Sequence, residues 1–138
     1  MILVDAGPLV ALIDADDRHH EACVKTLAVI REPVGTVWPA ITEAMYLLAD
    51  VPRGQTAVWR MLERGAVQLL ALGEEDIARM RQLMEKYADL PMDLADAALV
   101  CVANRDRVRT VFTLDRRDFG VYRLPGGKRL GILPKVAS

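Results

Sequence analysis

Short apolar runs alternate with longer segments of helical periodicity along the chain. The apolar runs favour buried β strands, which we predict at residues 2–4, 36–38, 67–72 and 110–112, with an edge strand at 130–133. The longer segments predict helices over residues 7–13, 20–30, 41–49, 56–64, 74–87 and 93–104. Such alternation is typical of βαβ units. We therefore expect an α/β fold with a short, mostly parallel sheet and helices on both of its faces.

Length and composition indicate one domain. The chain has 138 residues, of which 52% are hydrophobic, and this is enough to fill a single core. We therefore expect one domain over residues 1–138. Its apolar runs are shorter than the ~18 residues that a membrane-spanning helix needs, and the N-terminus lacks the pattern of a signal peptide. We expect a cytoplasmic protein without membrane contact.

Charge is distributed unevenly along the chain. Residues 1–50 carry three basic and eight acidic side chains, whereas residues 101–138 carry nine basic and three acidic ones. A basic end of this kind is typical of proteins that contact a polyanion or an acidic partner. A solvated surface without any partner would give the same pattern.

Acidic residues recur where predicted strands end and where helices begin. Asp5 follows the first strand, Glu43 lies in the first turns of the helix after the second, and Asp115 comes just past the fourth. Asp96 lies in the first turn of the helix that precedes the fourth strand. Ligands of open α/β sheets bind at the carboxyl ends of the strands, so we expect these acids to converge there. Each of them also has an ordinary explanation as a helix cap or a turn residue.

The surroundings of these acids favour a metal site. Asp5, Glu43 and Asp96 lie in apolar segments without basic neighbours, and a buried acid needs a compensating cation. Carboxylates without Cys or His ligands suit Mg²⁺ or Mn²⁺, ions that promote phosphodiester hydrolysis. The chain has no GxGxxG and no GxxxxGK[ST] motif for a nucleotide phosphate. The acids and the basic end together indicate metal-dependent cleavage of a phosphodiester.

Four segments together resemble the PIN-domain ribonucleases, in particular the VapC-type toxins of toxin–antitoxin pairs. They are "ILVDAGPLVALID", "ITEAMYLL", "DAALVCVA" and "VFTLDRRDF". The resemblance implies a catalytic, metal-binding pocket made by Asp5, Glu43, Asp96 and Asp115. The chain departs from the common family pattern at Ala6, where many members carry Ser or Thr.

The resemblance also suggests accessory roles around this pocket. Thr113 matches a hydroxyl position that helps to order the pocket in the family, and an ordinary strand-end threonine would look the same. Asp93 is interpreted as a helix cap rather than a ligand. Asp118 is interpreted as structural, paired with a nearby arginine, with a role in the site as the alternative. The segment "TLDRRDF" is predicted as a charged turn in which Arg116 and Arg117 contact RNA, an antitoxin or only solvent.

A metal-dependent endoribonuclease is the activity that this resemblance implies. RNA would be hydrolysed with Mg²⁺ or Mn²⁺ to leave a 5′-phosphate and a 3′-hydroxyl. A small antitoxin would inhibit the enzyme with a basic side chain, and the apolar N-terminal helices would supply the surface of a homodimer.

Two alternatives remain open at this point. The first is a PIN-like module that binds RNA or protein without activity. The second is an Asp-based phosphatase or receiver-type domain. Gly7, two residues after Asp5, counts against a DxD phosphatase.

Overall fold

A five-stranded parallel sheet forms the centre of the protein in a computed structural model that describes residues 1–135. The strands lie in the order β3-β2-β1-β4-β5, and every neighbouring pair is parallel. Their bounds are β1 (Ile2–Val4), β2 (Val34–Thr36), β3 (Gln68–Leu69), β4 (Thr110–Phe112) and β5 (Gly131–Leu133). The predicted α/β class is confirmed, and in residues 1–135 the sheet is wholly rather than mostly parallel.

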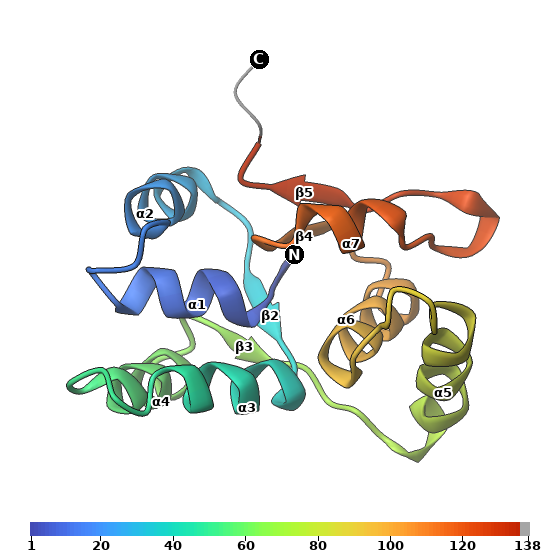
Figure 1. The fold of residues 1–138 in the computed structure, drawn as a ribbon, viewed down its shortest axis with the longest axis horizontal. Helices are drawn as coiled ribbons and strands as arrows, with labels where there is room; N and C mark the ends of the chain where they lie inside the picture. The colour runs from blue at the N-terminus through green and yellow to red at the C-terminus, as the bar shows by residue number, and fades with distance from the viewer. Residues whose placement is uncertain (136–138) are drawn as a thin grey trace.

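Helices cover both faces of this sheet. Figure 1 shows α5 and α6 on one side and α1, α3 and α4 on the other. The helices are α1 (Ala6–Ile13), α2 (His20–Val29), α3 (Trp38–Leu47), α4 (Gly54–Glu63), α5 (Ile77–Lys86), α6 (Leu94–Arg105) and α7 (Arg116–Val121), with 3₁₀ turns η1 (Glu74–Asp76) and η2 (Pro125–Gly127). Across the part of the chain that is described, every helix is too short or too polar to cross a membrane.

The alternation of side chains along β1 divides the core into two parts. Leu3 and Val111 pack with α5 and α6, whereas Ile2, Val4 and Phe112 pack with α1, α3 and α4. Successive residues of a strand point to opposite faces, so a strand of three buried residues supplies both cores. This places the end of β1 between the two cores, at the middle of the sheet.

The second strand lies two residues earlier than the predicted range of 36–38. Gly35, which sequence reasoning treated as a break, lies inside β2, where an added Cβ would stand only 3.0 Å from the Met1 sulfur. Trp38 instead opens α3, with Pro39 in the first turn where its missing N–H costs nothing.

Two further predictions need correction. The strand predicted over residues 67–72 shortens to β3, an exposed edge that pairs only with β2. The charged segment after β4 was predicted as a turn, but it forms the helix α7. Asp115 is the N-cap of this helix and accepts a hydrogen bond from the backbone N–H of Asp118.

Candidate functional site

Six carboxylates from distant parts of the chain line one pocket at the carboxyl end of the sheet. The pocket has a volume of about 420 Å³, and none of its described lining residues is basic. The acids are Asp5, Glu43, Asp93, Asp96, Asp115 and Asp118. The structure therefore brings together all four acids of the predicted pocket and both of the accessory aspartates.

Asp5 is held in place by the ends of two neighbouring strands. It caps α1, with Oδ1 accepting the backbone N–H of Ala6 at 2.8 Å, and Oδ2 accepting the Thr113 hydroxyl at 2.9 Å. Thr113 is fully buried, and its Oγ1 also accepts the backbone N–H of Asp115 at 3.0 Å. One hydroxyl thus joins the end of β1 to the segment after β4. Burial raises the pKa of Asp5 despite these hydrogen bonds.

Asp96 is a buried acid inside a helix that is apolar on every side. Residues 95–103 of α6 are all buried, and Asp96 itself is only 8% exposed. The Tyr122 hydroxyl donates to its Oδ2 at 2.7 Å. Burial is the main reason that the pKa of Asp96 is raised to about 8; the hydrogen bond from Tyr122 opposes the rise, and the negative charges of neighbouring aspartates add to it. At neutral pH without a cation, this carboxyl therefore holds its proton.

Tyr122 was missed by sequence reasoning as a partner of the site. A buried tyrosine usually finds a hydrogen-bond partner, but this rule does not tell which one. The partner here lies 26 residues earlier, on a different element. Only the packing of the chain segment after α7 against α6 brings the two side chains together.

Three of the acids form the tightest group. Asp96, Asp115 and Asp118 each offer an oxygen atom, and these atoms lie within 4.8 Å of one another. Asp118 was interpreted as the partner of a nearby arginine, yet among residues 1–135 it forms no ion pair within 4.0 Å. Its pKa is raised by burial and then by the negative charge of Asp115. Asp118 therefore lies within the acidic cluster.

Asp93 and Glu43 complete the rim of the pocket. Asp93 is the N-cap of α6 and accepts the backbone N–H of Asp96 at 2.8 Å, so its interpretation as a cap agrees with the structure. Asp93 also lines the acidic pocket, so it is both a helix cap and a residue of the pocket wall. Glu43 is an exposed residue of α3 whose pKa is raised by partial burial and by the charges of Asp5 and Asp93.

The two arginines of α7 lie outside the pocket lining. Both Arg116 and Arg117 are exposed, and a guanidinium nitrogen of Arg116 donates to the carbonyl oxygen of Pro134. The positive charge of Arg117 opposes the rise in the pKa of Asp118. Their contact with RNA or an antitoxin stays a prediction.

The chemistry of the cluster fits a hard divalent cation. Its donors are carboxylate oxygens, and the pKa values of Asp5, Glu43, Asp96 and Asp118 are all raised. These four shifts share two causes: burial and the negative charge of neighbouring acids both disfavour the ionised carboxylate. A bound Mg²⁺ or Mn²⁺ would relieve both effects, and these ions prefer oxygen ligands.

Comparisons with known proteins agree with this geometry. The family model described as PIN domain matches residues 2–124. Ribonuclease VapC26 of Mycobacterium tuberculosis (strain ATCC 25618 / H37Rv) is 33% identical over 135 residues, which cover 96% of this chain and 100% of the relative.

Two solved structures share the fold. The first is Mycobacterium tuberculosis VapC20, described as a Sarcin-Ricin loop cleaving toxin. Its TM-score is 0.78 at 17% identity, over 85% of this chain and 92% of that one. The second is a toxin–antitoxin complex from Klebsiella pneumoniae, with a TM-score of 0.68 at 16% identity over 88% of this chain and 92% of that one.

Proposed function

The chain belongs to the PIN domain family, and from this premise we propose that it is a metal-dependent endoribonuclease and the toxin of a toxin–antitoxin pair. The observation that carries the proposal is the pocket of six carboxylates, in a chain that is 33% identical to a ribonuclease along nearly its whole length. A pocket with this charge repels the RNA backbone unless a cation lies between them. A divalent ion is therefore part of the proposal.

Asp5, Glu43, Asp96 and Asp115 would hold the ion, and Asp118 is close enough to share in this role. When bound, Mg²⁺ or Mn²⁺ stabilises negative charge on the phosphodiester and lowers the pKa of water. The protein's own contribution is to fix the ligands. Thr113 and Tyr122 each donate a hydrogen bond to a carboxylate oxygen, which leaves the remaining lone pairs of Asp5 and Asp96 free for the ion.

An antitoxin fits the surface next to the pocket. A shallow apolar hollow of about 510 Å³ is lined by Trp38, Pro39 and Leu94, and it shares Glu43 and Asp93 with the acidic pocket. We assign this hollow to an antitoxin segment with apolar side chains and one basic side chain. The apolar side chains would cover Trp38, and the basic one would enter the acidic pocket and replace the ion.

A homodimer is the second assembly that we propose. Large apolar side chains are exposed on the N-terminal helices, among them Val29 at 72% and Tyr46 at 81%. Exposed apolar surface of this kind is typical of protein–protein contacts. Light scattering coupled to size-exclusion chromatography should give the mass of two chains, and the mass of one chain would contradict the dimer.

Cleavage of a mixed RNA pool tests the proposed activity. The protein should cut RNA with Mg²⁺ or Mn²⁺, leave 5′-phosphates, and have no activity in EDTA. Asp115→Asn should be inactive, and Asp50→Asn, a change at an exposed residue outside the pocket, should cut like the original. RNA binding without cleavage would indicate an inactive module. Hydrolysis of p-nitrophenyl phosphate without RNA cleavage would indicate a phosphatase.

A further inference from the structure

A second, basic pocket lies at the other end of α6. It has a volume of about 240 Å³, and its charged lining residues are Arg107, Arg109 and Lys128, with Asn104 beside them and no acid. We propose that this pocket binds phosphate groups of single-stranded RNA outside the acidic pocket. The inference rests on the proposed function, since it adds a contact for the same substrate.

The three cations of the pocket have no counter-ion. All three are exposed, and within residues 1–135 none of them forms an ion pair within 4.0 Å. Neighbouring arginines differ in this respect. Arg105 contacts Asp76 at 2.7 Å, and Arg123 donates to three backbone carbonyl groups at the C-terminal end of α7. Those two arginines stabilise the fold, whereas the pocket cations are free to bind an anion.

The end of α6 sets the backbone of Arg107. Its φ is +57°, in the left-handed region, and the backbone N–H of Val108 donates to the carbonyl oxygen of Ala103 at 2.9 Å. This is the Schellman ending of a helix, in which glycine is the usual residue at the left-handed position. A residue with a Cβ is strained there. Arg107 therefore lines the pocket from a backbone position that glycine would occupy with less strain.

Regular structure holds the other two cations beside it. Arg109 immediately precedes β4, and its carbonyl oxygen accepts the backbone N–H of Gly131 at 2.8 Å. Lys128 closes the η2 turn, where its carbonyl oxygen accepts the N–H of Leu124 at 2.8 Å. The turn needs left-handed backbone at Gly126, whose φ is +83°. The backbone positions of the three residues are therefore set by a helix end, a strand start and a tight turn.

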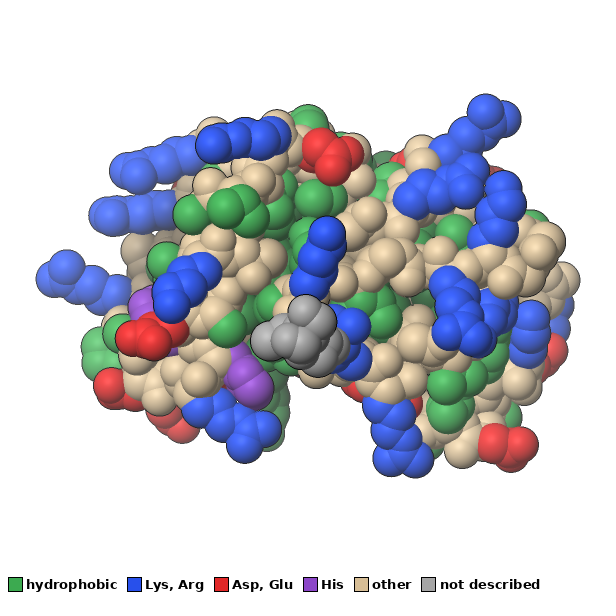
Figure 2. Space-filling model, turned by 90° about the horizontal axis from the view of Figure 1, so that it is seen from above, with side chains coloured by type: hydrophobic (Ala, Val, Ile, Leu, Met, Phe, Trp, Pro, Cys, Tyr) green, Lys and Arg blue, Asp and Glu red, His purple; other side chains and the backbone are tan. Residues whose placement is uncertain are grey.

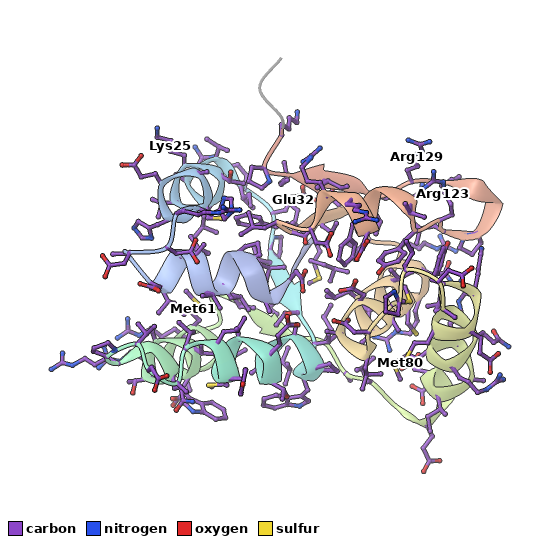
Figure 3. The ribbon with its side chains drawn as sticks, in the orientation of Figure 1. Lys25, Glu32, Met61, Met80, Arg123 and Arg129 are labelled. Carbon is purple, nitrogen blue, oxygen red and sulfur yellow. The ribbon has the colours of Figure 1, made fainter. Side chains whose placement is uncertain are left out.

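The position of the pocket suits a substrate that also reaches the acidic site. Asp96 and Asn104 are eight residues apart on α6, which corresponds to roughly 12 Å along the helix axis. Figure 2 shows Lys and Arg side chains at both ends of this face, and one of these groups lies at the right-hand end, where Figure 1 draws α5 and α6. Figure 3 places Arg123 and Arg129 at the same end. An RNA strand leaving the metal site would meet positive charge there.

RNA binding in EDTA tests the inference without cleavage. The probe is a fluorescein-labelled single-stranded 12-mer of mixed sequence, followed by anisotropy at several salt concentrations. Arg107→Gly should weaken binding about threefold or more, and Arg107→Gly/Arg109→Gln/Lys128→Gln about tenfold or more. The salt slope should fall by about 0.7 for each phosphate that a variant no longer neutralises. Lys25→Gln, at an exposed residue of α2 (Figure 3), should bind like the original.

Thermal melting separates a ligand site from a structural role. Arg107→Gly removes the backbone strain, so its Tm should equal or exceed that of the original. The alternative is that the cations only stabilise the negative end of α6. A lower Tm for Arg107→Gly together with unchanged RNA affinity would support that alternative and overturn the inference.

Binding of other anions shows which chemical class of ligand the basic pocket takes. Loss of polyglutamate or inorganic phosphate binding in the triple variant, with RNA affinity unchanged, would also overturn the RNA site. Absence of Mg²⁺-dependent cleavage by the original protein would contradict the proposed function itself. Cleavage by the original together with normal RNA affinity of the triple variant would contradict only the basic pocket.

Discussion

Replacing Asp96 with asparagine should stabilise the metal-free protein at neutral and alkaline pH. Asp96 is 8% exposed, and its pKa is raised from 3.8 to about 8, mainly by burial. Between these two values the folded protein holds a proton that the unfolded chain releases. The free energy of unfolding therefore falls as the pH rises through this window, and below pH 4 the loss disappears. Asparagine carries no charge, and its Oδ1 can still accept from Tyr122.

The size of this stabilisation follows from the pH range between the two pKa values of Asp96. Each pH unit between 3.8 and 7 lowers the free energy of unfolding of the original protein by about 1.4 kcal/mol. This gives an upper bound of roughly 4 kcal/mol at pH 7. Water that enters the pocket makes ionisation of Asp96 less costly, so the true difference lies below this bound. We therefore expect the free energy of unfolding of Asp96→Asn to exceed that of the original protein by about 2–4 kcal/mol at pH 7.

Urea unfolding in EDTA from pH 4 to pH 8.5 measures this difference. The matched control is Asp76→Asn, because Asp76 is equally buried at 4% exposed but lies 2.7 Å from Arg105. Its pKa is lowered by the hydrogen bond from the N–H of Gly73 and by Arg105, so its ionised form stabilises the fold above pH 4. The free energy of unfolding of Asp76→Asn should be about 2–3 kcal/mol lower than that of the original protein at pH 7, a change of opposite sign to that of Asp96→Asn.

The reasoning would be refuted by parallel pH curves. If Asp96→Asn and the original protein differ by the same amount at every pH, Asp96 does not titrate within the window. If Asp96→Asn is less stable than the original protein at pH 8, the Asp96 carboxylate of the original protein is stabilised without a cation. Either result would mean that burial and the neighbouring charges do not raise the pKa of Asp96 in the metal-free pocket.

Three further predictions concern the ion and the activity. Mg²⁺ or Mn²⁺ at 10–100 times its Kd should stabilise the original protein by roughly 1–3 kcal/mol in thermal melts and Asp115→Asn much less; equal shifts would contradict a site at Asp115. Tyr122→Phe should keep the fold but weaken Mn²⁺ binding by about 10–100-fold in calorimetric titration, and unchanged affinity would mean that the tyrosine does not orient Asp96. Induction of the original protein alone should stop bacterial growth, whereas Glu43→Gln should not; equal growth arrest would argue against catalysis as the cause.

The sequence predicted those parts of the site that depend on topology. Asp5 and Asp115 each follow an apolar run that became a strand, and in a parallel sheet such ends meet at one edge. The runs that became β1 and β4 were predicted with the observed bounds, because every residue of β1 and two of the three in β4 are buried. The local sequence pattern therefore predicted the strand bounds correctly for these two buried strands.

The parts that were missed or left open depend on the helix α7 and on contacts between distant residues. Asp118 lies three residues after Asp115, so the two share a side of the chain only once α7 is recognised as a helix. Tyr122 reaches Asp96 only through packing against α6. Gly35 lies in a strand where the Met1 and Leu70 side chains leave little room for a Cβ, and sequence pattern does not show this.

Comparison of Asp96→Asn with Asp93→Asn in Mg²⁺-dependent RNA cleavage tests the central claim most directly. Both acids line the pocket at the start of α6, but Asp93 is an exposed N-cap, and Asn caps a helix as well as Asp does. Asp96 is buried and belongs to the tightest group of carboxylates. The account predicts no cleavage by Asp96→Asn and most of the original rate for Asp93→Asn. An inactive Asp93→Asn beside an active Asp96→Asn would contradict it.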